Sequence, residues 1–251
     1  MKFLVIGDSC TDKCIYGKCE RICPEAPVPV FTPTGATSNG GMAKNVQANV
    51  IALGFDCDIE TNKSKIEKKR FVDRTSNQML LRVDVGDGGT TDFFDRTKVK
   101  WDNYDAILVS DYDKGFLRDI DVNKICLEHD NVFLNTKRKF NHDIPRNIRF
   151  VQMNENELNN NHWLPLTVKG TQESYVKDKV IVTLGGRGCY YRNKVYAPPR
   201  KREVRDLSGA GDTFLAALSV SIMKKNSIEK AIQFAQECAC KVVSKRGVAT
   251  I

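Results

Sequence analysis

The sequence lacks any apolar run long enough to cross a membrane, which takes about 18 residues. Its first residues, 1–7, carry one charged side chain and a short apolar stretch, and Asp8 follows with no small-residue cleavage site. This pattern is typical of a buried first strand and not of a signal peptide. We therefore expect a cytoplasmic protein that has no membrane partner.

The sequence also lacks a Cys-x-x-Cys pair, the spacing that zinc and iron–sulfur sites usually show. Its nine cysteines are odd in number and follow no export signal, so reduced thiols are favoured over a disulfide framework. Cys10, Cys14, Cys19 and Cys23 lie close together in the sequence. A metal site at these four thiols is the weaker alternative.

Acidic residues are fewer than basic ones, and the net charge of +8 suits nucleic acid, a membrane surface or phosphorylated small molecules. The basic clusters at 63–70, 137–139 and 200–202 are short. They have no interleaved aromatic side chains of the kind that line a nucleic-acid groove. Net charge is thus the only feature that would support a nucleic-acid partner. We therefore expect none.

Short apolar runs alternate with segments of helical periodicity, without an internal repeat. The runs at 3–6, 106–109, 132–134 and 180–184 are apolar on both faces, as in a parallel sheet that helices cover. The alternation of strands and helices predicts an α/β layered fold. A chain of 251 residues is long enough for one large core and is commonly a single domain.

Two helices are marked by their ends as well as by their apolar faces. Val46, Val50 and Leu53 recur on one face of the first, and Gly54 is placed to end it. Ser227 is a plausible N-cap for the second, over 228–243. The extended segments at about 27–32 and 70–85 do not fit the alternation, and they predict a small accessory β-sheet.

The strongest chemical signal is the string Asp206-Leu-Ser-Gly-Ala-Gly-Asp-Thr-Phe214, which precedes an apolar helix. Its small residues let backbone N–H groups at a helix N-terminus face an anion closely, and the helix dipole favours phosphate there. Asp212 beside such a site can accept a proton from an attacking hydroxyl. A simple glycine turn with Asp212 as a helix cap is the alternative, and the length of the string disfavours it.

This string resembles the signature of the ribokinase-like, or PfkB-type, carbohydrate kinases. The resemblance implies a three-layer α/β/α fold over 1–251, with a mostly parallel central sheet and a small β lid. It also implies that Asp212 is the catalytic base. The anion hole maps onto three consecutive backbone amides, those of Gly209, Ala210 and Gly211.

A second family signature resembles the string Gly40-Gly-Met-Ala-Lys-Asn45. The resemblance implies that the backbone at these glycines approaches the sugar and that a side-chain amide bonds its hydroxyls. The implied sugar-binding residues are Asp12, Gly40, Gly41 and Asn45.

Segments 7–17, 21–30, 77–84 and 110–115 narrow the resemblance to the heptose 7-phosphate 1-kinases, with Cys23 at a position that is serine in that subgroup. The implied reaction is ATP-dependent phosphorylation of a sugar or sugar phosphate, with heptose 7-phosphate at its anomeric hydroxyl as the favoured substrate. A homodimer through the lid is also implied.

The string Asn154-Glu-Asn-Glu157 resembles the family motif that orders Mg²⁺ and the nucleotide phosphates. The resemblance implies ATP and Mg²⁺ as cofactors, with the metal reached by Glu157 through water. The implied nucleotide-binding residues are Lys137, Asn154, Glu157, Thr183, Gly185 and Gly188.

The chain also departs from this subgroup. Only 23 residues separate Gly54 from Gln78, where the subgroup carries a longer segment, and Cys14 stands where it usually has tyrosine. The alternative is therefore a catalytically reduced, kinase-like protein that binds a sugar phosphate or a protein partner. The intact Asp212, Asn154 and Glu157 favour an active kinase.

Overall fold

The computed structural model describes residues 1–139, 144–145, 147–161, 166–167, 170–171, 178–199, 206–245 and 247–251. The basic cluster at 200–202 lies outside these residues. Within the described ranges, no helix combines the length and the apolar content that a bilayer crossing requires.

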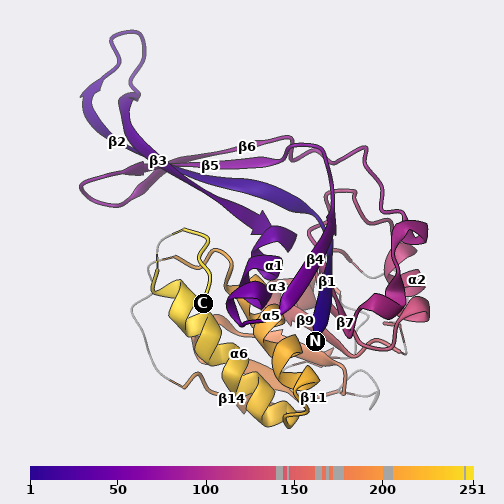
Figure 1. Ribbon diagram of the computed structural model, residues 1–251. Coiled ribbons are helices and arrows are strands. Elements are labelled where there is room, and N and C mark those ends of the chain that lie inside the picture. The colour runs from indigo at the N-terminus through magenta and orange to yellow at the C-terminus, as the bar shows by residue number, and fades with distance from the viewer. Residues whose placement is uncertain are drawn as a thin grey trace.

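Within the described residues, an eight-stranded sheet forms the centre of the protein, in the order β14-β13-β12-β9-β8-β7-β1-β4 (Figure 1). Neighbouring strands from β4 to β12 run parallel, and β12, β13 and β14 pair antiparallel at one edge. The predicted, mostly parallel sheet is confirmed. Its strands are β1 (Lys2–Gly7), β4 (Asp56–Thr61), β7 (Ala106–Asp111), β8 (Val132–Thr136), β9 (Phe150–Asn154), β12 (Val180–Thr183), β13 (Cys189–Tyr191) and β14 (Lys194–Tyr196).

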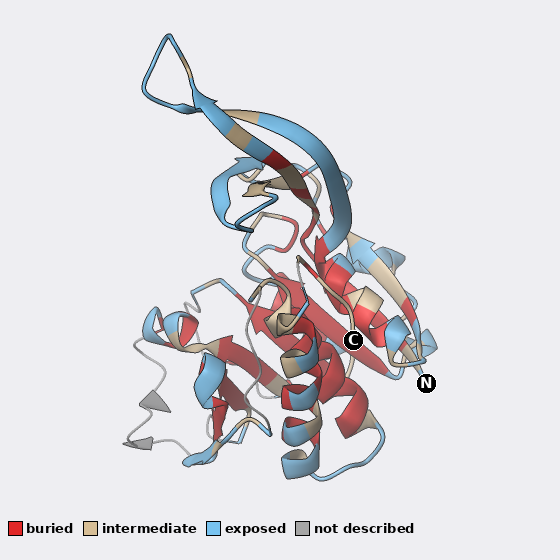
Figure 2. Ribbon diagram, turned by 90° about the vertical axis from the view of Figure 1, so that its left-hand side faces the viewer, coloured by how far each residue is buried: buried red, intermediate tan, exposed pale blue. Residues whose placement is uncertain are grey.

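Helices cover both faces of this sheet. Alternating side chains of β1 explain how, because Phe3 and Val5 pack with α1, α5 and α6, whereas Leu4 and Ile6 pack with α2 and α3. Both sets are buried, and Figure 2 shows the core as a continuous buried region. The helices are α1 (Ala43–Ala52), α2 (Asp121–Glu128), α3 (Glu155–Asn159), α5 (Ala210–Met223) and α6 (Ile228–Val243). The predicted three-layer α/β/α fold is confirmed.

Shorter elements connect these layers. They are the 3₁₀ turns η1 (Arg96–Lys98), η2 (Trp101–Asn103) and η3 (Gly185–Arg187), and the two-residue strands β10 (Leu166–Thr167) and β11 (Gly170–Thr171).

The two helices predicted from their end signals are both present. Gly54 follows α1 with a φ of +87°, and its amide donates a hydrogen bond to the carbonyl of Ile51 at 2.9 Å. Ser227 precedes α6, and its side chain accepts a hydrogen bond from the amide of Lys230 at 3.4 Å. In both cases a local signal was sufficient, because caps act within one helical turn.

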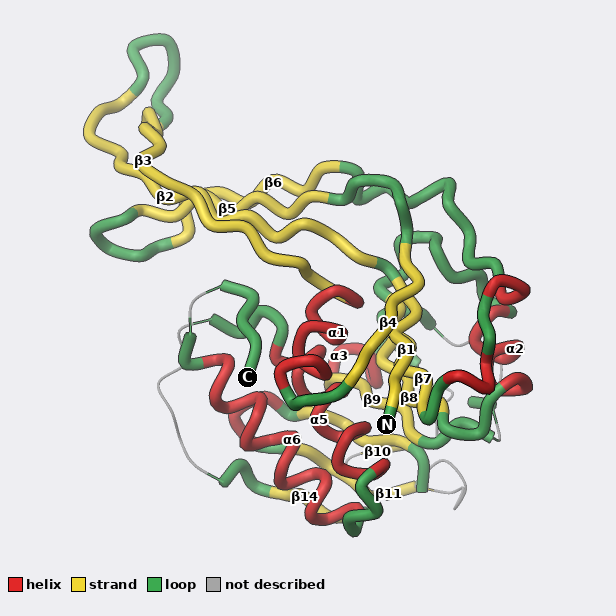
Figure 3. Tube along the Cα trace, viewed as in Figure 1, coloured by secondary structure: helices red, strands yellow, loops and turns green. Residues whose placement is uncertain are grey.

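A separate four-stranded sheet projects from the body as a lid, in the order β3-β2-β5-β6 (Figure 3). Its strands are β2 (Ser9–Ile22), β3 (Pro29–Met42), β5 (Glu67–Asp73) and β6 (Met79–Val85). The expected segments at 27–32 and 70–85 contribute to it, but the sheet is larger than predicted. Strand β2 was not predicted, because the charged Asp12 lies between its buried positions Cys10 and Cys14 and interrupts the apolar alternation.

Candidate active site

The candidate site lies at the carboxyl ends of the parallel strands, the usual ligand edge of such a sheet. Asp8 follows β1, Tyr112 follows β7, and Lys137 follows β8. Glu157 lies in the first turn of α3, which begins where β9 ends. Residues distant in the sequence therefore meet at one edge because the strands that carry them are parallel neighbours.

The N-terminus of α5 points into this edge. Gly209 is the N-cap residue with a φ of +80°, a left-handed conformation that suits glycine, and Asp212 lies in the first turn. First-turn amides have no partner within the helix and carry the positive end of its dipole. The amide of Ala210 donates to the carbonyl of Leu207 at 3.3 Å, so one of the three predicted anion-hole amides has an internal acceptor here.

Asp212 is buried and held by two donors. The Asn45 side chain donates to Oδ2 at 3.0 Å, and the Tyr112 hydroxyl donates to Oδ1 at 2.8 Å. Burial raises the pKa of Asp212 to about 6, while these hydrogen bonds and the nearby ammonium groups of Lys137 and Lys68 favour the ionised form. Asp212 is therefore a carboxylate near neutral pH that retains a substantial affinity for a proton.

Asn45 has a fixed orientation. Asn49, one turn later in α1, donates to its Oδ1 at 3.2 Å, so the Asn45 amide nitrogen is directed toward Asp212. The sequence predicts that Asn45 binds the sugar. In the structure its amide group contacts the carboxylate of Asp212 and, at 3.4 Å, the carbonyl of Gly209.

Asp12 and Gly41 lie together on the lid side of the site. A Cβ at Gly41 would lie 2.7 Å from the Cys10 sulfur and 3.3 Å from Asp12 Oδ2, so only glycine fits beside this carboxylate. Asp12 pairs with Arg70 of β5, and Arg70 also donates to the Ser208 hydroxyl at 3.3 Å. These contacts connect the lid to the segment that precedes α5.

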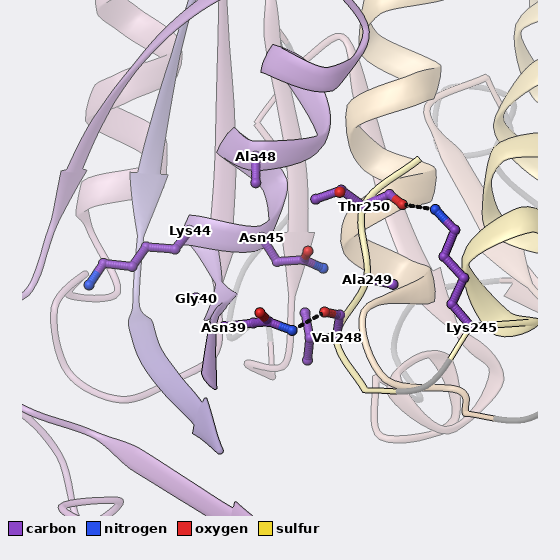
Figure 4. Close-up of a pocket in the computed structure, with 9 residues that line it drawn as sticks. All are labelled: Asn39, Gly40, Lys44, Asn45, Ala48, Lys245, Val248, Ala249 and Thr250. Atoms are coloured by element: carbon purple, nitrogen blue, oxygen red, sulfur yellow. Dashed lines mark hydrogen bonds between the residues drawn. The ribbon is translucent and has the colours of Figure 1, made fainter. Parts of the chain in front are cut away.

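A cavity of about 390 Å³ adjoins Asn45 (Figure 4). This volume is within the range of small-molecule sites. Asn39 donates to the carbonyl of Val248 at 2.7 Å, and Lys245 donates to the carbonyl of Thr250 at 2.6 Å, so the C-terminal segment forms one wall. Asn45 both lines the cavity and bonds Asp212. The lining residues are Asn39, Gly40, Lys44, Asn45, Ala48, Lys245, Val248, Ala249 and Thr250.

The predicted nucleotide residues gather around β9. Lys137 forms an ion pair with Glu157. Asn154 and Glu157 form a capping box, in which the Asn154 side chain accepts from the Glu157 amide at 2.9 Å and Glu157 accepts from the Asn154 amide at 2.7 Å. The sequence motif thus has a local structural role, which holds the Glu157 carboxylate next to the ammonium of Lys137.

Thr183 and Gly185 lie beside this group, because Thr183 pairs with Asn154 in the sheet. Gly185 has a φ of +58° and open space where a side chain would be. Gly188 is different, because a Cβ there would lie 2.0 Å from the carbonyl oxygen of Tyr196. The structure therefore gives Gly188 a role in packing against β14, and its predicted nucleotide contact stays a prediction.

The carboxylates at this edge do not converge on one point. Among the described residues, no three His, Cys, Asp or Glu side chains are close enough to hold a metal ion together. Mg²⁺ near nucleotides usually takes only one or two carboxylates, with water and phosphate oxygens as its other ligands. Glu157 fits such an indirect role. The four cysteines considered as metal ligands are free thiols, namely Cys10, Cys14, Cys19 and Cys23.

Tyr112 and Lys68 also belong to the site, although no role was predicted for them from the sequence. Tyr112 lies within the segment 110–115 that resembles the heptose kinases, directly after a buried strand, and that position was an available signal. Lys68 lay within a basic cluster that fitted a solvated surface equally well. Nothing in the sequence showed that β5 would turn it toward the ring of Tyr112.

A carboxyl-edge site with a helix N-terminus aimed into it suits an α/β protein that binds a phosphorylated ligand. Residues 121–251 match the family described as "pfkB family carbohydrate kinase". The chain is also 30% identical to "Bifunctional protein HldE" of Helicobacter pylori (strain J99), with 99% of this chain and 64% of that protein covered. The chain belongs to the pfkB family of carbohydrate kinases.

The alignment with this relative spans 296 positions, more than the 251 residues of the chain, so the relative contains residues that have no counterpart here. The chain spans 64% of the relative's length. Ribokinase of Thermotoga maritima has the same fold, with a TM-score of 0.72 and 16% identity over 99% of this chain and 94% of that one. Arabidopsis thaliana ribokinase, complexed with ribose and ATP, has a TM-score of 0.65 and 17% identity, with 98% of this chain and 93% of that one covered.

Proposed function

We propose that this protein transfers the γ-phosphoryl group of ATP to a hydroxyl of a sugar phosphate, with the anomeric hydroxyl of heptose 7-phosphate as the acceptor. The observation that carries the proposal is Asp212, a buried carboxyl in the first turn of α5 that two donors from other elements hold in place. A carboxyl with a pKa of about 6 is ionised at neutral pH and can accept the hydroxyl proton.

In this reaction Asp212 removes the proton from the acceptor hydroxyl while the phosphoryl group moves in line toward that oxygen. The backbone amides of Gly209, Ala210 and Gly211 stabilise the negative charge on the transferring group, as donors at a helix N-terminus do. Phosphoryl transfer depends mainly on positioning and on such electrostatic stabilisation. The close placement of base and amides on one helix turn supports this assignment.

The sugar is proposed to lie between the lid and α1, against Asp12, Gly40, Gly41 and Asn45. The cavity beside Asn45 supports this placement because it adjoins the group that holds Asp212. Positive side chains lie near Asp212, with Lys68 and Lys137 close enough to influence its pKa. This arrangement suits two substrates that both carry phosphate.

The nucleotide is proposed to lie over the carboxyl ends of β9 and β12, against Lys137, Asn154, Glu157, Thr183, Gly185 and Gly188. Lys137 would contact a phosphate group, and Glu157 would hold Mg²⁺ through water. Magnesium, when bound, neutralises phosphate charge as it develops. Open space beside Gly185 supports this side as the nucleotide face.

The test is a purified protein incubated with ATP, Mg²⁺ and a panel of sugar phosphates that includes heptose 7-phosphate. ADP formation is measured, and phosphorus NMR locates the new phosphate on the product. We expect ADP formation that depends on the sugar phosphate and a new anomeric phosphate signal from heptose 7-phosphate. No ADP with any acceptor, together with calorimetric binding of a sugar phosphate, would support the non-catalytic alternative instead.

A further inference from the structure

Tyr112 connects the two halves of the site. Its hydroxyl donates to Asp212 Oδ1 at 2.8 Å, and Lys68 and Lys137 each place an ammonium nitrogen close to its ring. The distances to the ring centroid are 5.4 Å from Lys68 and 5.3 Å from Lys137, which are attractive cation–π contacts. Lys68 belongs to the lid, and Lys137 pairs with Glu157 on the proposed nucleotide side. One aromatic ring therefore contacts both sides and the carboxylate between them.

The backbone around Tyr112 is held by a second buried carboxylate, Asp8. Asp8 accepts hydrogen bonds from the amide of Tyr112 at 2.9 Å and from the amides of Lys114 and Phe116, both at 3.2 Å. Asp8 is fully buried at the end of β1. Three amides that donate to one carboxylate fix the turn after β7. The tyrosine is therefore held at its backbone as well as at its hydroxyl.

We propose that Tyr112 is a positioning residue for Asp212, and that Asp8 acts through Tyr112 by fixing its backbone. The proposal rests on the proposed function of Asp212 as the base. Tyr112 and Asn45 each occupy a different oxygen of the carboxylate, which prevents its rotation. Each oxygen keeps further lone-pair capacity, so one remains able to accept the proton of the sugar hydroxyl.

Tyr112 also limits how far burial raises the proton affinity of Asp212. A hydrogen bond donated to a carboxylate favours its ionised form. The burial of the phenol and the proximity of Asp212 raise the pKa of Tyr112, so the hydroxyl stays a donor across the working pH range. The other groups facing Asp212 are Lys68 of β5, Lys137 after β8, and the Asn45 amide of α1, with the Cys10 thiol also nearby. Glu157 lies close enough to Tyr112 to act on its phenol.

The first test needs no activity. In Tyr112→Phe the carboxylate loses one donor that favours its ionised form, so the pKa of Asp212 should rise by about one pH unit. Carbon NMR of labelled aspartate carboxyls would follow this titration, with Asp212→Asn identifying the signal. Tyr104→Phe is the matched control. The Tyr104 hydroxyl also donates to an aspartate, Asp58, at 2.9 Å, but this pair lies outside the site. An unchanged titration of Asp212 in Tyr112→Phe would overturn the proposal.

The second test uses turnover. Tyr112→Phe should lower kcat roughly tenfold with little change in the KM for ATP, and the loss should be larger at pH 6 than at pH 8.5. The phosphate of the substrate also ionises near pH 6. The pH dependence of kcat in Tyr112→Phe is therefore compared with that in the Tyr104→Phe control, and only the difference between the two reports on Asp212. An equal loss at both pH values would contradict the proposal.

The role of Asp8 is tested by a double-mutant cycle. Asp8→Asn removes part of the acceptor capacity for the three amides, and it should raise the pKa of Asp212 in the wild-type background but not further in Tyr112→Phe. Additive shifts would show that Asp8 acts independently of Tyr112, against the proposal. If wild-type protein phosphorylates no sugar phosphate, the proposed function fails, whereas the NMR titration still decides whether Tyr112 controls this carboxyl.

Discussion

Asp212 has neighbours that change its proton affinity in opposite directions. Burial disfavours its charged form, and two donors together with two ammonium groups favour that form. The resulting pKa of about 6 lies near the pH at which a cellular enzyme works, which is where a general base is most effective. The arrangement depends on residues from four separate elements, so single substitutions around Asp212 have distinct and measurable effects.

Asp212→Asn should leave ATP affinity largely unchanged and lower turnover by roughly 10² to 10⁴. The amide has nearly the same shape as the carboxyl but cannot take the proton. Steady-state ADP formation with the best sugar phosphate measures the effect. Asp58→Asn is the control, since Asp58 also accepts from a tyrosine hydroxyl but lies outside the site. Turnover close to that of wild type in Asp212→Asn would refute the assigned base.

The same substitution should change how stability depends on pH. The pKa of Asp212 is raised from 3.8 in the unfolded chain to about 6 in the folded protein, so the folded state binds more protons between these values. Wild-type protein therefore loses stability as the pH rises from about 4 to about 6. Asp212→Asn lacks this loss, so its stability relative to wild type should be on the order of 3 kcal/mol higher above pH 6 than below pH 4. Urea unfolding at pH 4.5 and pH 8 would show whether the difference has this sign.

At the scale of elements, the turn before α5 and the first turn of α1 depend on each other. Gly209 has left-handed backbone, and its missing side chain leaves room for Asn45, since a Cβ there would lie 2.5 Å from Asn45 Nδ2 and 3.3 Å from Val248 Cγ1. The N-terminus of α5 and the residue that orients Asp212 therefore share one space. A change in either element displaces the other.

Gly209→Ala should consequently have two effects. The left-handed conformation costs roughly 1–2 kcal/mol for a residue with a Cβ, and the displaced Asn45 should lower kcat. Gly54→Ala separates these effects, because Gly54 has a φ of +87° and no atom within 4 Å of the added Cβ. Urea unfolding should show a loss of stability in both variants, larger in Gly209→Ala because Asn45 is also displaced, and turnover should fall only in Gly209→Ala. Equal turnover in the two variants would exclude the coupling with Asn45.

At the scale of the whole molecule, the two faces of the lid differ. Arg82 lies opposite Arg70 in the sheet, so both share the face that contacts Asp12 and the site. Leu81 lies opposite Phe71 on the other face, where Leu81 is 56% exposed. The face away from the site exposes apolar side chains such as Leu81 beside the ion pair of Lys69 and Glu67, and this suits a lid that a second copy of the chain covers. Such a two-fold contact is self-complementary.

Leu81→Asp should therefore yield monomers and raise the KM for the sugar phosphate more than the KM for ATP. Two carboxylates would be added to one interface, because the substitution occurs in both copies. Light scattering measures the assembly and steady-state kinetics the two constants. Leu127→Asp is the control, since Leu127 of α2 is 79% exposed and lies on the body. Wild-type protein that is monomeric at micromolar concentration would contradict the predicted dimer.

Local signals in the sequence determined the layered fold and the position of Asp212. Strand 3–6, the helix that ends before Gly54 and the helix capped by Ser227 are all encoded within a few residues of each element. The string around Asp212 likewise combines its glycines and its carboxyl within one helix turn. Short-range steric and hydrogen-bonding preferences are enough for such features.

The tertiary structure alone decided what surrounds Asp212. Asn45 and Asp212 are 167 positions apart, and Tyr112 and Asp212 are 100 apart, so no spacing in the sequence relates them. The extent of β2 could not be predicted either, because the charged Asp12 stands between its buried positions Cys10 and Cys14 and interrupts any apolar alternation. Contacts of this kind depend on which strands become neighbours in the sheet. That order is set by the packing of the whole core, and it brought Lys68 of the lid and Lys137 of the body to the same ring.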